Sequence, residues 1–174
     1  PEMKSTGEVM GIDYTFEAAL AKSLLAGGLA LPPQGSILLS IADKDKAESL
    51  PIIERFFDAG YRLYATEGTA AMIEKNGMAV KMITKKLGEG YPNVVDIILE
   101  GRVDGVVNTL SGGHAPYQDG FFIRRAAAEK RIPCFTSLDT ARATAEALAN
   151  GTQSYEVQPL REYLTRQPQG SRRD

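Results

Sequence analysis

Residues 36–70 read SILLSIADKDKAESLPIIERFFDAGYRLYATEGTA, and this stretch decides the fold. It begins with an apolar run over 37–41, which is typical of a short strand buried on both faces. Apolar side chains then recur at helical spacing over 45–58, and Gly60 is expected to end that helix before a second strand at 61–65. A strand, a helix and a second strand in this order predict a parallel βαβ unit.

The start of the helix over 45–58 has two interpretations. Either Asp45 and Glu48 form a capping box, and Pro51 then removes one helical hydrogen bond, or the regular helix begins near Ser49. The sequence alone leaves both of these starts open.

The same alternation of strands and helices continues along the chain. Further strands are expected at 79–83, 105–108 and 132–136, and further helices at 68–76, 93–100, 120–130 and 139–148. The sequence therefore predicts an α/β fold, an open five-stranded parallel sheet with helices on both faces.

The segments that flank this region have a different character. Residues 14–25 predict one short helix with Thr15 as its N-cap, and two consecutive prolines indicate a linker after it. The predicted organisation is an N-terminal segment (1–30), a linker (31–35), the α/β domain (36–150) and a frayed C-terminal tail (151–174).

Composition excludes several classes of protein. The net charge of −2 and the pI near 5.6 argue against bulk nucleic-acid binding, and no apolar run reaches the roughly 18–20 residues of a membrane helix. The single Cys134 excludes an internal disulfide and a multi-thiolate zinc site, so it is expected to be a small core residue. We expect a cytoplasmic protein, and because the chain begins with Pro1 we interpret it as part of a longer polypeptide.

Polar and cationic residues follow the predicted strands. Thr66, Gly68 and Thr69 come after the second strand, where two hydroxyls and the free N–H groups of a helix suit a phosphate. Lys85 follows the third strand, and Lys46 follows the first. Because the carboxyl ends of parallel strands meet at one edge of a sheet, we expect these groups to converge on a phosphorylated small ligand.

The end of the fourth strand adds Asn108, Thr109 and Ser111, whose amide and hydroxyls suit the rest of such a ligand. Taken singly, each motif also has an ordinary structural explanation as a helix cap, a solvated charge or a turn. His114, the single histidine, has no partner at metal-ligand spacing, and the sequence has no acyl-transfer triad or Walker-type lysine. We therefore expect no catalytic residue and no metal site.

Ordered motifs along nearly the whole chain resemble one protein family. The segment EMKSTGEVMG (2–11) resembles the signature that closes the second synthetase (ATP-grasp) half of the carbamoyl-phosphate synthase large chain. Three further stretches are similar to the C-terminal regulatory domain of that enzyme, which has a methylglyoxal-synthase-like, Rossmann-like fold: GYRLYATEGTA (60–70), GEGYPNVVDIILEGRVDGVVNT (88–109) and IRRAAAEKRIPCFTSLDTARATAEAL (123–148). The resemblance assigns 1–30 to the synthetase half and 36–150 to the regulatory domain.

The resemblance implies an allosteric role inside a larger enzyme. Members of this family make carbamoyl phosphate from bicarbonate, glutamine-derived ammonia and ATP, for pyrimidine and arginine synthesis. The ATP and Mg²⁺ or Mn²⁺ sites lie in the synthetase halves, so we expect no cofactor in this chain. The partners that the resemblance implies are a nucleotide effector, the remainder of the large chain and the glutaminase small chain.

The resemblance also implies which residues bind the effector. In bacterial members the regulatory domain binds UMP or IMP, and ornithine binds near the junction with the rest of the large chain. The family's phosphate contacts fall on Lys46, Thr66, Thr69 and Lys85, and its sugar and base contacts fall around Asn108, Thr109 and the loop after them.

Two alternatives remain beside the allosteric role. Methylglyoxal synthases deprotonate dihydroxyacetone phosphate with the aspartate of a Gly-Gly-Asp motif, where this chain has Gly90-Tyr91-Pro92. Neither tyrosine nor proline is a carboxylate base at neutral pH, and Asp96 lies later, so we expect phosphate binding without the lyase reaction. The other alternative is a structural module through which the parent enzyme forms homo-oligomers.

Overall fold

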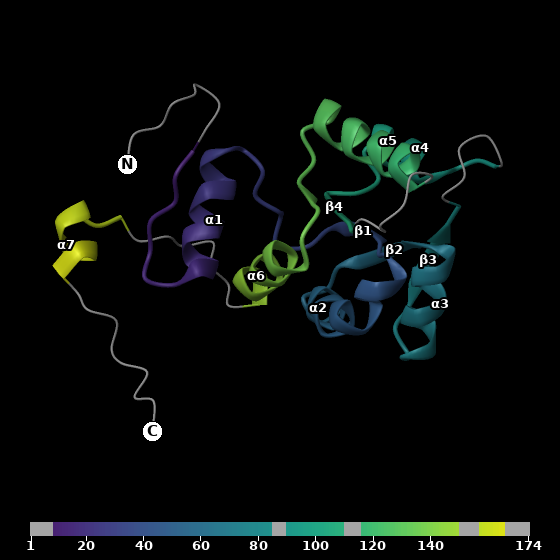
Figure 1. Cartoon of the computed structure of the whole chain (residues 1–174), viewed down its shortest axis with the longest axis horizontal. Helices are drawn as coiled ribbons and strands as arrows, with labels where there is room; N and C mark the ends of the chain where they lie inside the picture. The colour runs from purple at the N-terminus through teal and green to yellow at the C-terminus, as the bar shows by residue number, and fades with distance from the viewer. Residues whose placement is uncertain (1–8, 85–89, 110–115, 150–156, 166–174) are drawn as a thin grey trace.

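The computed structural model describes residues 9–84, 90–109, 116–149 and 157–165. Its centre is a five-stranded, all-parallel sheet with the strand order β3-β2-β1-β4-β5, which confirms the predicted fold class (Figure 1). The strands are β1 (Ser36–Ser40), β2 (Arg62–Thr66), β3 (Val80–Ile83), β4 (Gly105–Asn108) and β5 (Cys134–Phe135). The α-helices are α1 (Phe16–Ala26), α2 (Lys46–Asp58), α3 (Glu67–Lys75), α4 (Val94–Leu99), α5 (Pro116–Glu129), α6 (Leu138–Ala149) and α7 (Leu160–Thr165).

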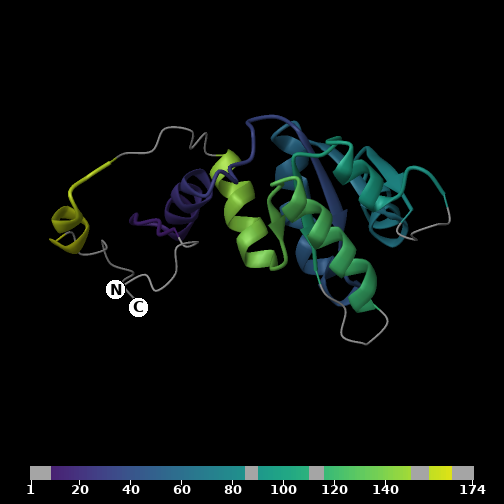
Figure 2. The ribbon, with the colours of Figure 1, turned by 90° about the horizontal axis from the view of Figure 1, so that it is seen from above.

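Two apolar clusters hold the helices on opposite faces of the sheet. Ile37 and Leu39 of β1 face one cluster, which includes residues of α2, α3 and α6. Leu38 faces the other cluster, which includes residues of α4 and α5. Because successive strand residues point to opposite faces, β1 is buried throughout, as its apolar run predicts. Seen from above, α5 (green) and α6 (yellow-green) lie against the strands (Figure 2).

The strand order creates a change of direction beside β1. From β1 the chain builds outward through β2 to β3, then returns to place β4 on the other side of β1. Ser40 and Asn108 are paired in the register of β1 with β4, so these two strands end level. In open parallel sheets ligands bind at the carboxyl ends of strands beside such a switch point.

The start of α2 agrees with the first of the two predicted alternatives, with Asp45 as N-cap and Pro51 inside the helix, but the predicted capping box is absent. A short 3₁₀ helix, η1 (Asp43–Asp45), leads directly into α2, which begins at Lys46 and not near Ser49. Asp45 is the N-cap but makes no side-chain cap bond, and Glu48 instead accepts a hydrogen bond from Arg142 of α6 at 2.7 Å. The capping-box prediction is therefore wrong, because the Glu48 side chain is used in an ion pair between helices.

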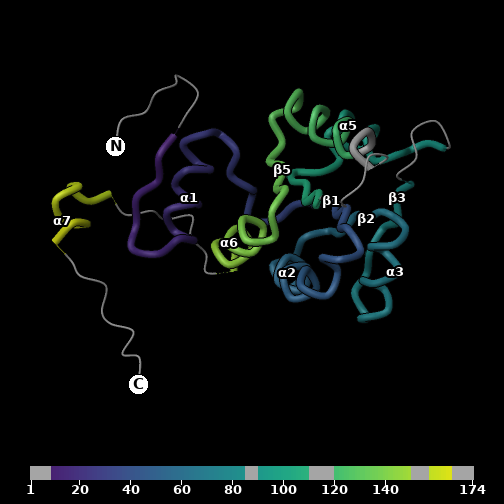
Figure 3. Tube along the Cα trace, viewed as in Figure 1, coloured from purple at the N-terminus to yellow at the C-terminus, as the bar shows by residue number. Residues whose placement is uncertain are grey.

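The N-terminal helix follows the prediction closely. Thr15 is the N-cap of α1, and its Oγ1 accepts a hydrogen bond from the Ala18 amide at 3.2 Å. α1 packs against α6, on the side of that helix away from the sheet (Figure 3). Leu31 of the predicted linker is buried in the core, where it lies against Gly105. A Cβ on Gly105 would lie 2.7 Å from Leu31 Cδ2, so a larger residue at this position of β4 would require the Leu31 side chain to shift.

The segment after α6 is more regular than the predicted frayed tail. Residues 160–165 form α7, which packs on the segment before α1, where the Tyr163 ring contacts the Tyr14 ring (Figure 1). The prediction of a frayed tail is wrong for this stretch. Contacts between residues far apart in the sequence hold α7 in place. Such contacts cannot be recognised from the local sequence pattern. Within the described ranges, none of the helices has both the length and the apolar character needed to cross a bilayer.

Tyr61, at the start of the second βα unit, makes stability sensitive to high pH. Its hydroxyl donates to the Pro32 carbonyl, and burial, together with the charge of Asp104, raises the pKa of Tyr61 to about 12. In the unfolded chain this phenol ionises near pH 10, so folding is favoured fully below pH 10 and loses about 1.4 kcal/mol per pH unit between 10 and 12.

Urea unfolding at pH 9, 10 and 11 tests this alkaline loss. The Tyr61→Phe variant is expected to be less stable at pH 9 but to lose less stability between pH 9 and 11 than the original chain. Parallel losses in the two proteins would assign the alkaline effect to other groups.

Candidate functional site

Hydrogen bonds between side chains and backbone join the loop after β1 to the first turn of α3 and to the residue after β4, at the carboxyl ends of the strands. The Ile41 amide donates to Thr69 Oγ1 of α3 at 3.1 Å, and the Ala42 amide donates to Thr109 Oγ1 after β4 at 2.8 Å. Both threonines are buried. The loop after β1 is therefore fixed on both sides, and it holds the edge of the sheet in one geometry.

The first turn of α3 lies in the middle of this edge. Thr66 occupies the N-cap position, but its side chain accepts no cap hydrogen bond from the helix. Instead, the Thr66 hydroxyl donates a hydrogen bond to Thr69 Oγ1 at 3.4 Å. Glu67 and Gly68 are exposed, so the N-terminus of α3 opens to solvent. The explanation of Thr66 as an ordinary helix cap is thus wrong, and the positive end of the α3 dipole remains available to an anion.

Lys46, from the first turn of α2, reaches this same helix end. A Cβ built on Gly68 would lie 3.0 Å from Lys46 Nζ, so the ammonium group lies against the first turn of α3. Lys46 also pairs with Asp43 Oδ1 at 2.7 Å, and the hydrogen bond from Lys46 lowers the pKa of the Asp43 carboxyl. Asp43 is 93% exposed, so water screens its partnership with Lys46.

The exposed Asp43 carboxylate offsets only part of the unfavourable placement of Lys46 at this helix end. A cation at the positive end of a helix dipole is destabilised by up to about 1 kcal/mol, whereas an anion there is stabilised. A phosphate between Lys46 and the N–H groups of α3 would satisfy both at once, in the way that helix N-termini commonly bind phosphates. The structure thus brings together four predicted residues at the first turn of α3: Lys46, Thr66, Gly68 and Thr69.

The predicted sugar and base residues are only partly described. Asn108 ends β4 and is 2% exposed, and its Nδ2 donates to the Gly120 carbonyl of α5 at 3.5 Å. Thr109 lies at the same edge, and its oxygen is used by the Ala42 amide. Lys85 and Ser111 lie outside the described residues. Asn108 and Thr109 therefore have structural bonds at the site, and their predicted role toward a ligand stays a prediction.

Asp43 is the site residue that sequence reasoning missed. It precedes Lys46 by three residues, and this spacing in Asp43-Lys44-Asp45-Lys46 is a weak signal for an ion pair. Gly68 was predicted as a phosphate-binding residue, but its closeness to Lys46 depends on how α2 and α3 are placed by the sheet.

The region where methylglyoxal synthases carry their aspartate has other roles here. Tyr91 is 72% exposed and donates to Glu100 Oε1 at 2.5 Å, and this hydrogen bond raises the pKa of Tyr91. Asp96 forms a capping box with Asn93, and the backbone amide of Asn93 donates to Asp96 Oδ2 at 2.9 Å. Asp96 therefore stabilises the start of α4. In the part of the chain that the structure describes, no group of three His, Cys, Asp or Glu residues could hold a metal ion.

Comparison with known proteins gives a consistent result. The sequence profile of the MGS-like domain family matches residues 48–136. The carbamoyl phosphate synthase large chain of Thermomicrobium roseum is 52% identical over 167 residues, which are 96% of this chain and 16% of that protein. This chain thus spans about one sixth of the length of that curated relative.

A solved structure supports the same fold. The methylglyoxal synthase of Elizabethkingia anophelis NUHP1 superimposes with a TM-score of 0.53 and 22% identity, covering 79% of this chain and 94% of that one. At this identity the likeness concerns the fold. The profile match spans about half of the chain, including β2 to β5 and the first turn of α3, and the chain belongs to the MGS-like domain family.

Proposed function

We propose that this chain is the allosteric domain of a carbamoyl phosphate synthase large chain and that it binds a nucleotide monophosphate of the UMP or IMP type. The likeness to the Thermomicrobium roseum protein supports the parent enzyme. In this proposal the parent is a cytoplasmic ligase that uses ATP with Mg²⁺ or Mn²⁺ and ammonia from a glutaminase small chain. It serves pyrimidine and arginine synthesis.

One observation carries the ligand proposal: the ammonium group of Lys46 lies against Gly68 in the first turn of α3. A nucleotide phosphate would lie between that ammonium and the N–H groups of α3, with the Thr66 hydroxyl as a further donor. Lys85 would add a second cation. Asp43 would exchange its bond with Lys46 for water, which costs little because Asp43 is already exposed.

No lyase activity is part of this proposal. Tyr91 and Pro92 occupy the region of the expected aspartate, and Asp96 is engaged in the capping box of α4. Regulation would require that the nucleotide bind one conformation of the whole enzyme better than another, because allosteric coupling is a difference in affinity between states.

Calorimetric titration of the chain with UMP and IMP at millimolar concentration tests the proposal. We expect at least one of them to bind, and we expect uridine, which lacks the phosphate, to bind much more weakly because the charge-assisted bonds are lost. Inorganic phosphate is expected to compete. No binding of either nucleotide, or equal binding of UMP and uridine, would contradict the proposal. Release of methylglyoxal from dihydroxyacetone phosphate would instead support an enzyme.

A further inference from the structure

A pocket of about 420 Å³ lies far from the sheet edge, between the two ends of the described chain. Residues 9–15, α1 and residues 157–165 line this open pocket, and we call residues 157–165 the C-terminal segment. Most of its lining is apolar, and its polar lining residues come from α1 and the C-terminal segment. The lining residues are Met10, Ile12, Lys22, Leu25, Ala26, Val157, Gln158, Leu160 and Tyr163.

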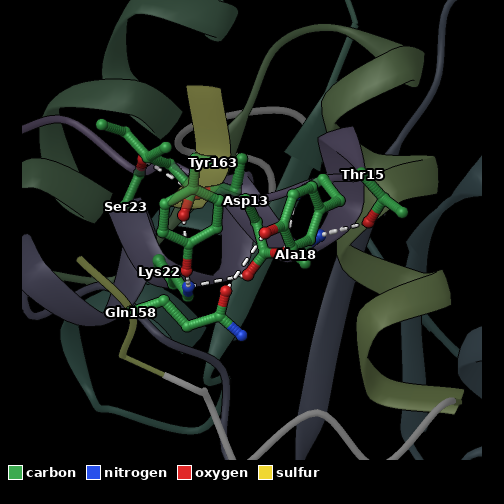
Figure 4. A network of polar contacts seen from close by, with 10 residues as sticks. Asp13, Thr15, Ala18, Lys22, Ser23, Gln158 and Tyr163 are labelled. Atoms are coloured by element: carbon green, nitrogen blue, oxygen red, sulfur yellow. Dashed lines mark hydrogen bonds and ion pairs between the residues drawn. The ribbon is translucent and has the colours of Figure 1, made fainter. Parts of the chain in front are cut away.

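Lys22 of α1 connects the three segments that line the pocket: residues 9–15, α1 and the C-terminal segment (Figure 4). Its Nζ lies 2.7 Å from Asp13 Oδ2 and donates to the Ile12 carbonyl at 3.1 Å, and both acceptors precede α1. The same ammonium donates to the Tyr163 hydroxyl of α7 at 2.9 Å. Lys22 thus holds the segment before α1 to a residue 141 positions after Lys22 in the sequence.

The charges of this cluster persist at neutral pH. Burial alone would raise the pKa of Asp13, but hydrogen bonds from Lys22 and the Tyr14 amide hold it below its usual value. Hydrogen bonds to Asp13 and then to Tyr163 raise the pKa of Lys22. The Asp13 and Lys22 side chains are only 20% and 16% exposed, so this ion pair is screened less than a surface pair.

Tyr14 adds a second link between the same segments. Its hydroxyl donates to Gln158 Oε1 at 3.1 Å, and its ring lies 5.0 Å from the ring of Tyr163 between centroids. The large aliphatic side chains of the C-terminal segment contribute little, because Val157, Leu160 and Leu164 are 84%, 58% and 79% exposed. A helix of six residues is unstable by itself in water, so α7 depends on tertiary contacts such as these.

We propose that the C-terminal segment is a reversible clasp that closes on residues 9–15 and is held by Lys22 between Asp13 and Tyr163. The closed clasp fixes the path by which residues 9–15 approach α1, and it forms one wall of the pocket. An open clasp frees both segments together while the sheet and its helices stay folded. The clasp is independent of the proposed nucleotide site, because it shares no residue with that site.

Tryptic cleavage after Arg161, an exposed residue of α7, measures how often the clasp opens. Lys22→Met removes the bridging cation and is expected to speed this cleavage about tenfold, the fold-change for losing one charge-assisted hydrogen bond. Tyr163→Phe removes only the hydroxyl and is expected to act in the same direction. Lys75→Met, the same change in the last turn of α3, is the matched control and is expected to leave the rate unchanged.

Hydrogen exchange of the strand amides separates opening of the clasp from a general loss of stability. The proposal predicts that strand exchange stays unchanged in Lys22→Met and Tyr163→Phe while cleavage after Arg161 accelerates. Cleavage at the original rate in both variants would overturn the clasp. Faster exchange of the strands in step with the cleavage would also overturn it, since Lys22 would then stabilise the whole fold.

Discussion

Replacement of Lys46 by methionine together with Thr66 by valine is expected to weaken UMP binding by at least about 100-fold, or about 3 kcal/mol. Each change removes one donor from the space at the first turn of α3, and hydrogen bonds to a charged phosphate contribute about 1.5–3 kcal/mol each. The remaining helix N–H groups would still attract an anion, so some weak binding should persist. Calorimetry on the double variant measures the loss directly.

Lys44→Met is the matched control for this result. Lys44 lies in η1 two residues before Lys46 and is exposed, so the control removes an equal charge from the same loop. It is expected to change the affinity for UMP by less than about threefold, since an exposed charge is screened by water and salt. Equal losses in the control and in the double variant would mean that net charge, and not the position of the ammonium group, governs binding.

Truncation of Phe56 to alanine is expected to lower the free energy of unfolding by about 3–5 kcal/mol. Phe56 of α2 is fully buried, and its ring packs edge-to-face on Tyr61 with 5.7 Å between centroids. The change leaves a large cavity between α2 and the sheet, and the sheet cannot collapse to fill it. Denaturant unfolding measures the difference.

Phe57→Ala provides an adjacent control, because Phe57 is 37% exposed on the same helix. It is expected to cost clearly less than Phe56→Ala, since less apolar surface leaves the core. Similar losses in the two variants would contradict the placement of α2 on the sheet.

The strands and most helices could be predicted because their signals are local. The apolar run of β1 indicates burial on both faces of the sheet. Thr15 is a residue type that commonly caps helices, so the start of α1 could be predicted from the local sequence. The start of α2 was harder, because Glu48 suits a capping box equally well but pairs with Arg142, 94 residues away. Local patterns cannot choose between a cap and a partner that tertiary packing supplies.

The candidate site shows the same division. The hydroxyls of Thr66 and Thr69 were predicted from their position after an apolar run, and they lie at the expected sheet edge. Their different roles could not be predicted, because only the packed structure shows that Thr69 is buried and bonded to the Ile41 amide. The C-terminal segment was missed for a related reason: its contacts join it to Tyr14 and Lys22, and its own sequence carries little periodic signal.

Amide chemical shifts of the isotope-labelled chain during titration with UMP test the anion site most directly. The proposed anion site predicts that the largest changes fall on the amides of Glu67, Gly68 and Thr69, with a smaller change at Lys46, because a phosphate would lie against these groups. Changes confined to α1 and the C-terminal segment, or none at millimolar UMP, would contradict it.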